Sequence, residues 1–289
     1  MEQLPDAALV MVMQYLNRND LFTCRLVCKR LGAVAVHPNA WRGRSHMYCN
    51  STAFRACPVL RIAPCLNYLE IHMLSEEMFQ CCQLMLATTR CAVRSVAVSL
   101  SGSERGVLRL AALLLRRQEA LGGLRAVKIE LCEEDENGDD ASVLLATVAS
   151  MPDLKRLVVA GITANKPNLV SHYFTSSSLE YFECELRPES ASFCTFIIAA
   201  HANALQEVDL AGRPMEWICS SSTSLAPLLA GLPNLRKLRS RMLPGLEALA
   251  DSTSLRELSL VVRPADQPGV GGAAALLSRA KQLRAVTLE

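Results

Sequence analysis

Charged residues alternate with apolar ones in three short segments of the C-terminal half of the chain. These charged positions are, in chain order, Glu183, Glu185, Glu207, Asp209, Lys237, Arg239 and Arg241. Residues two apart point to the same face of a β-strand, so acids and bases would share one face if the segments are neighbouring strands. The chemistry that this pattern supports is ionic. The charges can pair with one another or hold a charged group of a bound molecule.

One interpretation is a ladder of ion pairs between strands. Parallel neighbours lie ~4.8 Å apart, which would allow Glu207 to pair with Lys237 and Asp209 with Arg239. Such solvated pairs contribute only ~0.2–1 kcal/mol each to stability.

The other interpretation is a polar stripe that binds a protein target, with Tyr181 as its aromatic anchor. Arg241 has Ala211 rather than an acid at the corresponding position of the preceding segment. It is therefore the better candidate for a substrate carboxylate or phosphate. The full set of candidate substrate-binding residues is Tyr181, Glu183, Glu207, Asp209, Lys237, Arg239 and Arg241.

Neither a catalytic set nor a metal site is expected. The five His are scattered, and no glycine-rich phosphate loop or His-Glu-x-x-His motif occurs. His46, Cys49, Cys57 and Cys65 have spacings that match no common zinc pattern, so buried thiols are the better interpretation. We expect a non-catalytic protein without cofactors.

Composition narrows the class of protein. The 289 residues carry 30 Lys and Arg against 28 Asp and Glu, a net charge of +2, and 51% are hydrophobic. This excludes a disordered chain and argues against nucleic acid as the main partner. The apolar windows are far shorter than a membrane span, and the N-terminus lacks the basic region of a signal peptide. With twelve Cys and no signal, we expect free thiols in the cytoplasm, the nucleus or both, and no membrane partner.

One hexamer organises most of the chain: apolar, two residues, apolar, one residue, apolar. It starts nine times, at residues 66, 93, 124, 154, 179, 205, 235, 255 and 283, about 27 residues apart on average. Helical spacing lies between the hexamers, as at Phe193, Phe196 and Ile197 or at Leu243, Leu246 and Leu249. Each unit would be a strand followed by a helix, and one unit cannot bury both apolar faces alone. The sequence therefore predicts an α/β solenoid with parallel strands on the concave side and helices on the convex side.

The first forty residues have a different pattern. Pro5 and Asp6 suit the start of a helix, Asp20 is the expected N-cap of a second, and Pro38 interrupts a third. So short a segment rarely folds alone, and it holds more apolar residues than three short helices can hide. We expect some of them to pack on a partner or, alternatively, to cap the first repeat.

These residues resemble an F-box. The resemblance rests on Leu4-Pro5, Leu9, Tyr15-Leu16, Asp20-Leu21, the segment 24–31, Pro38 and Trp41-Arg42. Leu31 stands where that family often has Trp, and Ala7 replaces a common acid. The stretch from 65 to 289 resembles the leucine-rich repeats of ribonuclease-inhibitor-like and F-box proteins, although the usual Asn or Cys after the strand is mostly missing.

The resemblance implies the substrate-recognition subunit of an SCF-type cullin–RING ubiquitin ligase. Its F-box would dock on a Skp-type adaptor, and its repeats would capture an unknown protein target. The candidate adaptor-binding residues are Leu4, Pro5, Leu9, Val12, Leu16, Leu21, Val27, Leu31 and Trp41. The alternative is a leucine-rich-repeat scaffold that is not coupled to ubiquitination.

The expected domains are an F-box at 1–42, a linker or irregular first repeat at 43–64, and about nine leucine-rich repeats at 65–289. The last hexamer is followed by no closing helix, so we expect an exposed strand edge there. Either the chain is a piece of a longer product or that edge pairs with something.

Overall fold

The computed structural model describes residues 4–48, 58–73, 88–100, 106–131, 138–162, 178–212, 224–262 and 267–289. These residues form two compact units, 1–125 and 126–289. Both are mixed α/β structures with parallel strands.

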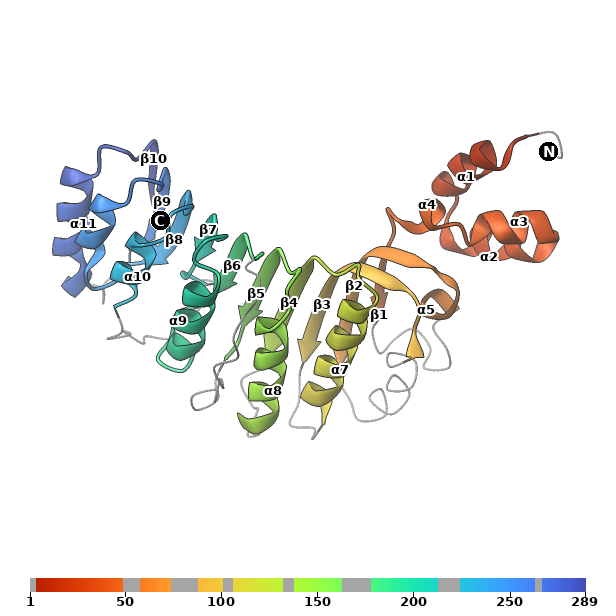
Figure 1. Ribbon diagram of the computed structural model, residues 1–289, viewed down its shortest axis with the longest axis horizontal. Coiled ribbons are helices and arrows are strands. Elements are labelled where there is room, and N and C mark those ends of the chain that lie inside the picture. Colours follow the sequence, from red (N-terminus) through yellow and green to blue (C-terminus); the bar gives the residue numbers. More distant parts are fainter. Residues whose placement is uncertain are drawn as a thin grey trace. The chain divides into compact units, whose positions relative to one another are not determined.

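The first unit begins with four helices rather than the three expected (Figure 1). They are α1 (Asp6–Tyr15), α2 (Arg18–Val27), α3 (Lys29–Ala35) and α4 (Pro38–Trp41). Helix α2 ends at Cys28, whose backbone is extended and whose thiol accepts a hydrogen bond from the Leu31 N–H. The N-cap of α2 is Asn17 and not Asp20, because the Asn17 side chain accepts from the Asp20 N–H at 2.9 Å.

A parallel sheet follows in the first unit. It contains β1 (Ser45–Tyr48), β2 (Cys65–Met73) and β3 (Ala92–Leu100), paired in chain order, with Ser45 opposite Tyr68 and Tyr68 opposite Ser95. The helices α5 (Pro58–Ile62) and α7 (Val107–Ala120) accompany it. Gln118 ties α7 to the start of β3, because its side chain accepts from the Val93 N–H and donates to the Cys91 carbonyl.

The second unit continues the strand–helix alternation. Its strands pair in parallel and in chain order, and the helices lie on one face of the sheet (Figure 1). We refer to the opposite face, which the sequence analysis expected to be concave, as the helix-free face. The elements are β4 (Ala126–Leu131), α8 (Gly138–Ala149), β5 (Arg156–Ala160), β6 (Tyr181–Cys184), α9 (Ala191–Ala200), β7 (Glu207–Asp209), α10 (Ala226–Ala230), β8 (Lys237–Arg241), η1 (Leu246–Asp251), β9 (Glu257–Val261), α11 (Gln267–Arg279) and β10 (Ala285–Leu288).

All nine predicted strands are present, and the apolar positions of the hexamer face the core. In β9, Leu258 and Leu260 are 2% and 0% exposed, and behind β6 the rings of Phe182 and Phe193 meet at 6.1 Å. Burying each such side chain contributes roughly 1.5–3 kcal/mol. In β10 the equivalent side chain of Leu288 is 61% exposed.

One expected helix is a tighter one. The segment with Leu243, Leu246 and Leu249 forms the 3₁₀ helix η1 instead of an α-helix. The hexamers on either side start only twenty residues apart, the shortest spacing in the chain. That length leaves room only for a short, tightly wound helix of 6 residues, entered through Gly245 with φ 79°.

Candidate functional site

Two surfaces carry the residues singled out by the sequence. The first comprises α1, α2 and the residues just before α1, where large apolar side chains are open to solvent. Tyr15 is 90% exposed, Leu26 84% and Val27 64%. Leu4, Met11 and Val12 are also exposed. We name these six residues the exposed apolar set; side chains of this kind are typical of a surface that another protein covers.

Three of the predicted contact residues lie in the core instead. Leu9, Leu21 and Trp41 are all less than 5% exposed. The Trp41 indole donates to the Ala35 carbonyl at 2.7 Å, and its ring lies 5.9 Å from that of Phe22. These residues hold the helices together and cannot form the outer surface.

The remaining predicted residues divide between surface and intermediate positions. Leu4, Pro5, Val12 and Val27 are exposed, whereas Leu16 and Leu31 are half-buried. Met11, Tyr15 and Leu26 were missed. The adjacent apolar residues Leu26 and Val27 could have indicated this surface. Neighbouring residues of a helix differ by about 100° in direction, and this pair follows the buried Leu21 on the same short helix.

Arg44, just before β1, and His46, within β1, contact these helices. Arg44 donates to the Met13 carbonyl at 2.8 Å and to the Ala40 carbonyl at 2.7 Å, and its guanidinium lies over the Trp41 ring. His46 contacts Arg18 through Nδ1. Burial, reinforced by the charge of Arg18, lowers the pKa of His46 to about 4, so the imidazole is neutral near pH 7.

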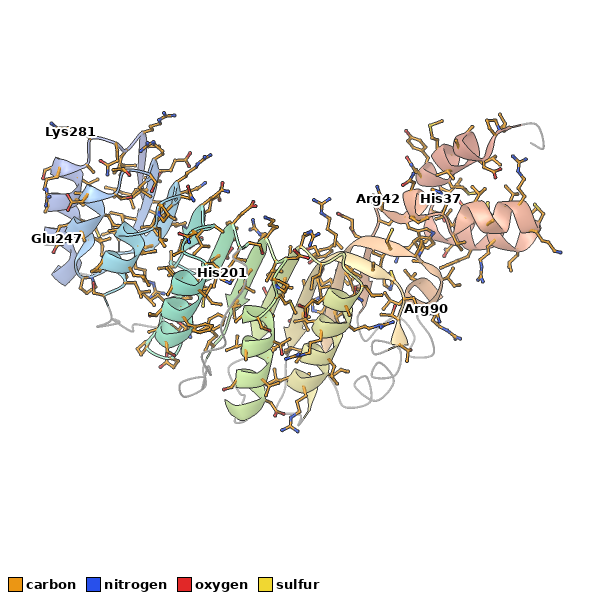
Figure 2. All side chains as sticks on the ribbon, in the orientation of Figure 1. His37, Arg42, Arg90, His201, Glu247 and Lys281 are labelled. Atoms are coloured by element: carbon orange, nitrogen blue, oxygen red, sulfur yellow. The ribbon has the colours of Figure 1, made fainter. Side chains whose placement is uncertain are left out.

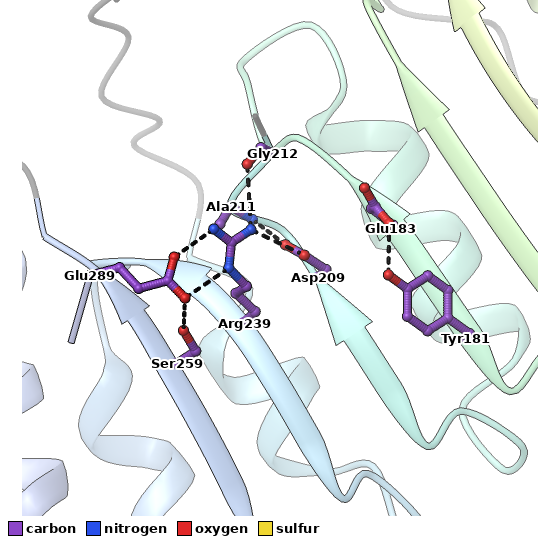
Figure 3. A network of polar contacts seen from close by, with 8 residues as sticks. All are labelled: Tyr181, Glu183, Asp209, Ala211, Gly212, Arg239, Ser259 and Glu289. Atoms are coloured by element: carbon purple, nitrogen blue, oxygen red, sulfur yellow. Dashed lines mark hydrogen bonds and ion pairs between the residues drawn. The ribbon is translucent and has the colours of Figure 1, made fainter. Parts of the chain in front are cut away.

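The second surface is the helix-free face of the second unit. The strand register places Glu183 opposite Asp209, Asp209 opposite Arg239, and Arg239 opposite Ser259. The predicted charges therefore do lie side by side. Asp209 and Arg239 form the expected ion pair at 3.2 Å, and Arg239 also contacts Glu289 at 2.7 Å (Figure 3).

Tyr181 lies on this face as expected, between charged neighbours. Its hydroxyl donates to Glu183 at 2.6 Å, and the Arg156 guanidinium lies 3.6 Å from the ring centroid (Figure 3 shows the bond to Glu183). Burial, followed by the hydrogen bond to Glu183, raises the pKa of Tyr181 well above its usual value. The phenol therefore remains protonated and keeps its hydrogen bond to Glu183, which fixes the ring beside the Arg156 guanidinium.

Lys237 and Glu207 lie opposite each other, as the sequence predicted, but Lys237 forms its ion pair elsewhere. It pairs with Glu257 of the following strand at 3.5 Å. Both of these side chains are more than half exposed, so this pair contributes little to stability.

The expectation that Arg241 lacks an acidic partner is wrong. Its guanidinium forms an ion pair with Glu185, two strands away, and the side chains are only 10% and 14% exposed. Arg241 reaches across the small side chain of Ala211 in the intervening row. Space for Glu185 comes from Gly212, because a Cβ at that position would lie 2.6 Å from the Glu185 side chain.

Among the described residues, His201 and the pair Cys184 and Cys194 are buried groups with reactive potential. His201, labelled in Figure 2, ends α9 and is 3% exposed, and burial lowers its pKa. The contact with Cys194, together with burial, raises the pKa of Cys184, so the Cys184 thiol is not poised as a nucleophile. Within the described ranges, no three His, Cys, Asp or Glu side chains gather closely enough to hold a metal ion. Cys49 and Cys57 lie outside those ranges. No described helix is both long and apolar enough to cross a bilayer.

Comparison with known proteins identifies the N-terminal segment. Residues 1–46 match the family model described as F-box-like, which confirms the resemblance seen in the sequence and includes the start of β1. The chain thus carries an F-box-like domain at its N-terminus, and F-box domains typically bind Skp-type adaptors of cullin ligases. A search of curated proteins found no match for the chain.

Proposed function

We propose that the chain is the substrate-recognition subunit of an SCF-type cullin–RING ubiquitin ligase. The F-box-like domain would dock on a Skp-type adaptor, and the remainder would capture a protein target in the cytoplasm or nucleus. The observation that carries this proposal is the exposed apolar set within the matched segment, where Leu26 is 84% and Tyr15 90% exposed. A domain that merely capped its own sheet would shield these side chains.

The remainder of the chain supports the second half of the proposal. We interpret residues 65–289 as about nine leucine-rich repeats in a solenoid, because strands and helices alternate at the predicted period and successive strands pair in parallel within each unit. In such a solenoid the helix-free face is open to a protein partner. The role is proximity and needs no catalytic group, since F-box proteins are generally non-catalytic adaptors.

Co-purification with a Skp-type adaptor tests the docking step. The full chain is compared with Leu26→Asp/Val27→Asp and with Leu113→Asp, which adds a charge at an exposed apolar position on α7. We expect the first variant to lose the adaptor and the second to keep it. Retention by both would favour the alternative, a repeat scaffold that is not coupled to ubiquitination.

Proximity labelling with the proteasome blocked then tests target delivery. Proteins labelled by both the intact chain and Leu26→Asp/Val27→Asp are bound partners. The lifetimes of these partners are then measured with the proteasome active, and those whose lifetime lengthens only with the docking variant are targets of the ligase. If no bound partner changes its lifetime, the ubiquitin-ligase role is refuted.

A further inference from the structure

Arg239 holds two carboxylates with two different edges of its guanidinium (Figure 3). Nη1 donates to Asp209 at 3.2 Å and to the Gly212 carbonyl at 3.4 Å. Nε and Nη2 donate to the two oxygens of Glu289, at 3.3 and 2.7 Å. The second edge makes the paired, side-on contact by which arginine recognises carboxylates and phosphates.

The Asp209 edge is built into the sheet. The Asp209 side chain is 18% exposed, and its Oδ1 accepts from the Ala211 N–H at 3.0 Å. Burial raises the pKa of Asp209, while the Ala211 N–H and the charge of Arg239 oppose that rise. Asp209 and the Gly212 carbonyl therefore hold the Arg239 guanidinium in place whether or not Glu289 is bound.

The Glu289 edge is open. The Glu289 side chain is 41% exposed and follows the last strand, β10. Besides Arg239, it receives one hydrogen bond, from the Ser259 hydroxyl at 2.7 Å. These contacts lower the pKa of Glu289 to about 2, so Glu289 holds the position as a carboxylate and a ligand must displace it. Three donors from two neighbouring strands would then point at one vacant oxyanion position.

The other two cations of β8 are used differently. Arg241 forms a shielded ion pair with Glu185, and Lys237 pairs with Glu257. Glu207 and Glu257 are the nearest exposed acids on these strands. They repel anions that approach without contacting Arg239, so the site accepts only a ligand that engages Arg239 directly.

We propose that Arg239 and Ser259 form a binding site for an oxyanion of the target, and that Glu289 occupies this site in the unbound chain. The ligand group is a carboxylate of an acidic side chain or a phosphate of a modified one. This inference rests on the proposed function, which it deepens by naming the chemical group that the target presents. Glu289 is thus an internal competitor, and removing it strengthens binding.

Titration of the full chain with inorganic phosphate and with N-acetylglutamate tests the site. Calorimetry and NMR of the Arg239 side chain measure the binding. Glu289→Ala is compared with the natural chain and with Glu257→Ala. The latter removes the same charge from an exposed side chain of the neighbouring strand. A tethered competitor acts at an effective concentration in the millimolar range, so Glu289→Ala should bind roughly tenfold more tightly. Glu257→Ala should tighten binding far less, because it removes a repelling charge but leaves Glu289 in the site.

Arg239→Gln in the Glu289→Ala background should abolish binding, and Ser259→Ala in that background should weaken it severalfold if the arginine variant does not fold. Equal tightening in Glu257→Ala, or full retention without Arg239, would overturn the site. Where binding is gained, the preferred probe identifies the source as an acidic or a phosphorylated residue. Adaptor co-purification is measured on the same variants. If the natural chain does not co-purify with the adaptor, the ligase role is refuted, and that result does not contradict the oxyanion site.

Discussion

Replacing Leu26 and Val27 by alanine should separate adaptor binding from folding. Both side chains are exposed at the C-terminal end of α2, so their removal disturbs few internal contacts. Exposed substitutions usually change the free energy of unfolding by less than about 0.5 kcal/mol. Any loss of adaptor binding therefore reports on the surface itself.

The size of the loss follows from the area that a partner can still cover. Leu→Ala removes three carbons and Val→Ala two, each of which contributes ~0.8 kcal/mol when buried. Scaled by the exposed fractions of 84% and 64%, the losses are about 2 and about 1 kcal/mol. Together they amount to ~3 kcal/mol, or about a hundredfold weaker dissociation constant.

The assay is a titration of the full chain with a Skp-type adaptor, paired with a chemical denaturation curve for each variant. Leu113→Ala is the matched control, because Leu113 is 54% exposed on α7, outside the F-box-like segment. Leu21→Ala is the opposite control, since Leu21 is buried and its truncation should cost about 2–5 kcal/mol of stability. An unchanged dissociation constant in Leu26→Ala/Val27→Ala would show that this part of α2 is not the docking surface.

Two further predictions concern stability. Arg241→Ala should destabilise the second unit by about 1.5–3 kcal/mol, because it removes one of the two arginines that pair with the shielded carboxylate of Glu185 and leaves Arg187. Lys237→Ala should cost less than about 1 kcal/mol, because its pair with Glu257 is exposed. Denaturation midpoints measure both costs, and equal costs would contradict the assignment. His46 has a pKa of about 4 in the folded chain against an ordinary 6.5, so its contribution is complete above pH 6.5 and is lost as the pH falls through 4. Stability followed from pH 7 to 4 should therefore fall less steeply in His46→Gln, and a profile identical to that of the natural chain would show that the histidine does not titrate as described.

The strands were predictable from sequence because a single rule sets them. Apolar residues at hexamer positions must be buried by the sheet and helices, and shifting any strand by one residue would expose them all. The same rule places Glu183, Asp209 and Arg239 in one row, because each occupies the same position of its hexamer and the hexamers pair in register. The prediction of an α-helix failed at the 3₁₀ helix η1, because helical spacing alone does not reveal how much chain is available to form a helix.

The N-terminal helices were less predictable in detail. Periodicity finds an apolar face, but it cannot separate the part that packs on neighbouring helices from the part left for a partner. Leu9 and Leu21 were therefore assigned to the outer surface although both are buried, and Tyr15 and Leu26 were overlooked. That division depends on how α1 to α4 pack. The packing is set by the breaks at Leu16 and Cys28, which are features of the backbone and not of the apolar pattern.

Arg239 and Arg241 show what else a strand pattern omits. They are the same residue type, two positions apart on β8 and on the same face, and the sequence ranked Arg241 as the freer of the two. The ranking considered only the adjacent strand, but an arginine side chain spans two. Arg241 therefore passes over Ala211 to a shielded acid and becomes part of the fold, whereas Arg239 meets a partly exposed acid beyond Ser259. The capacity of this face to bind an anion is thus decided by the second neighbour of each arginine, and a search for binding residues on parallel sheets should extend across two strands.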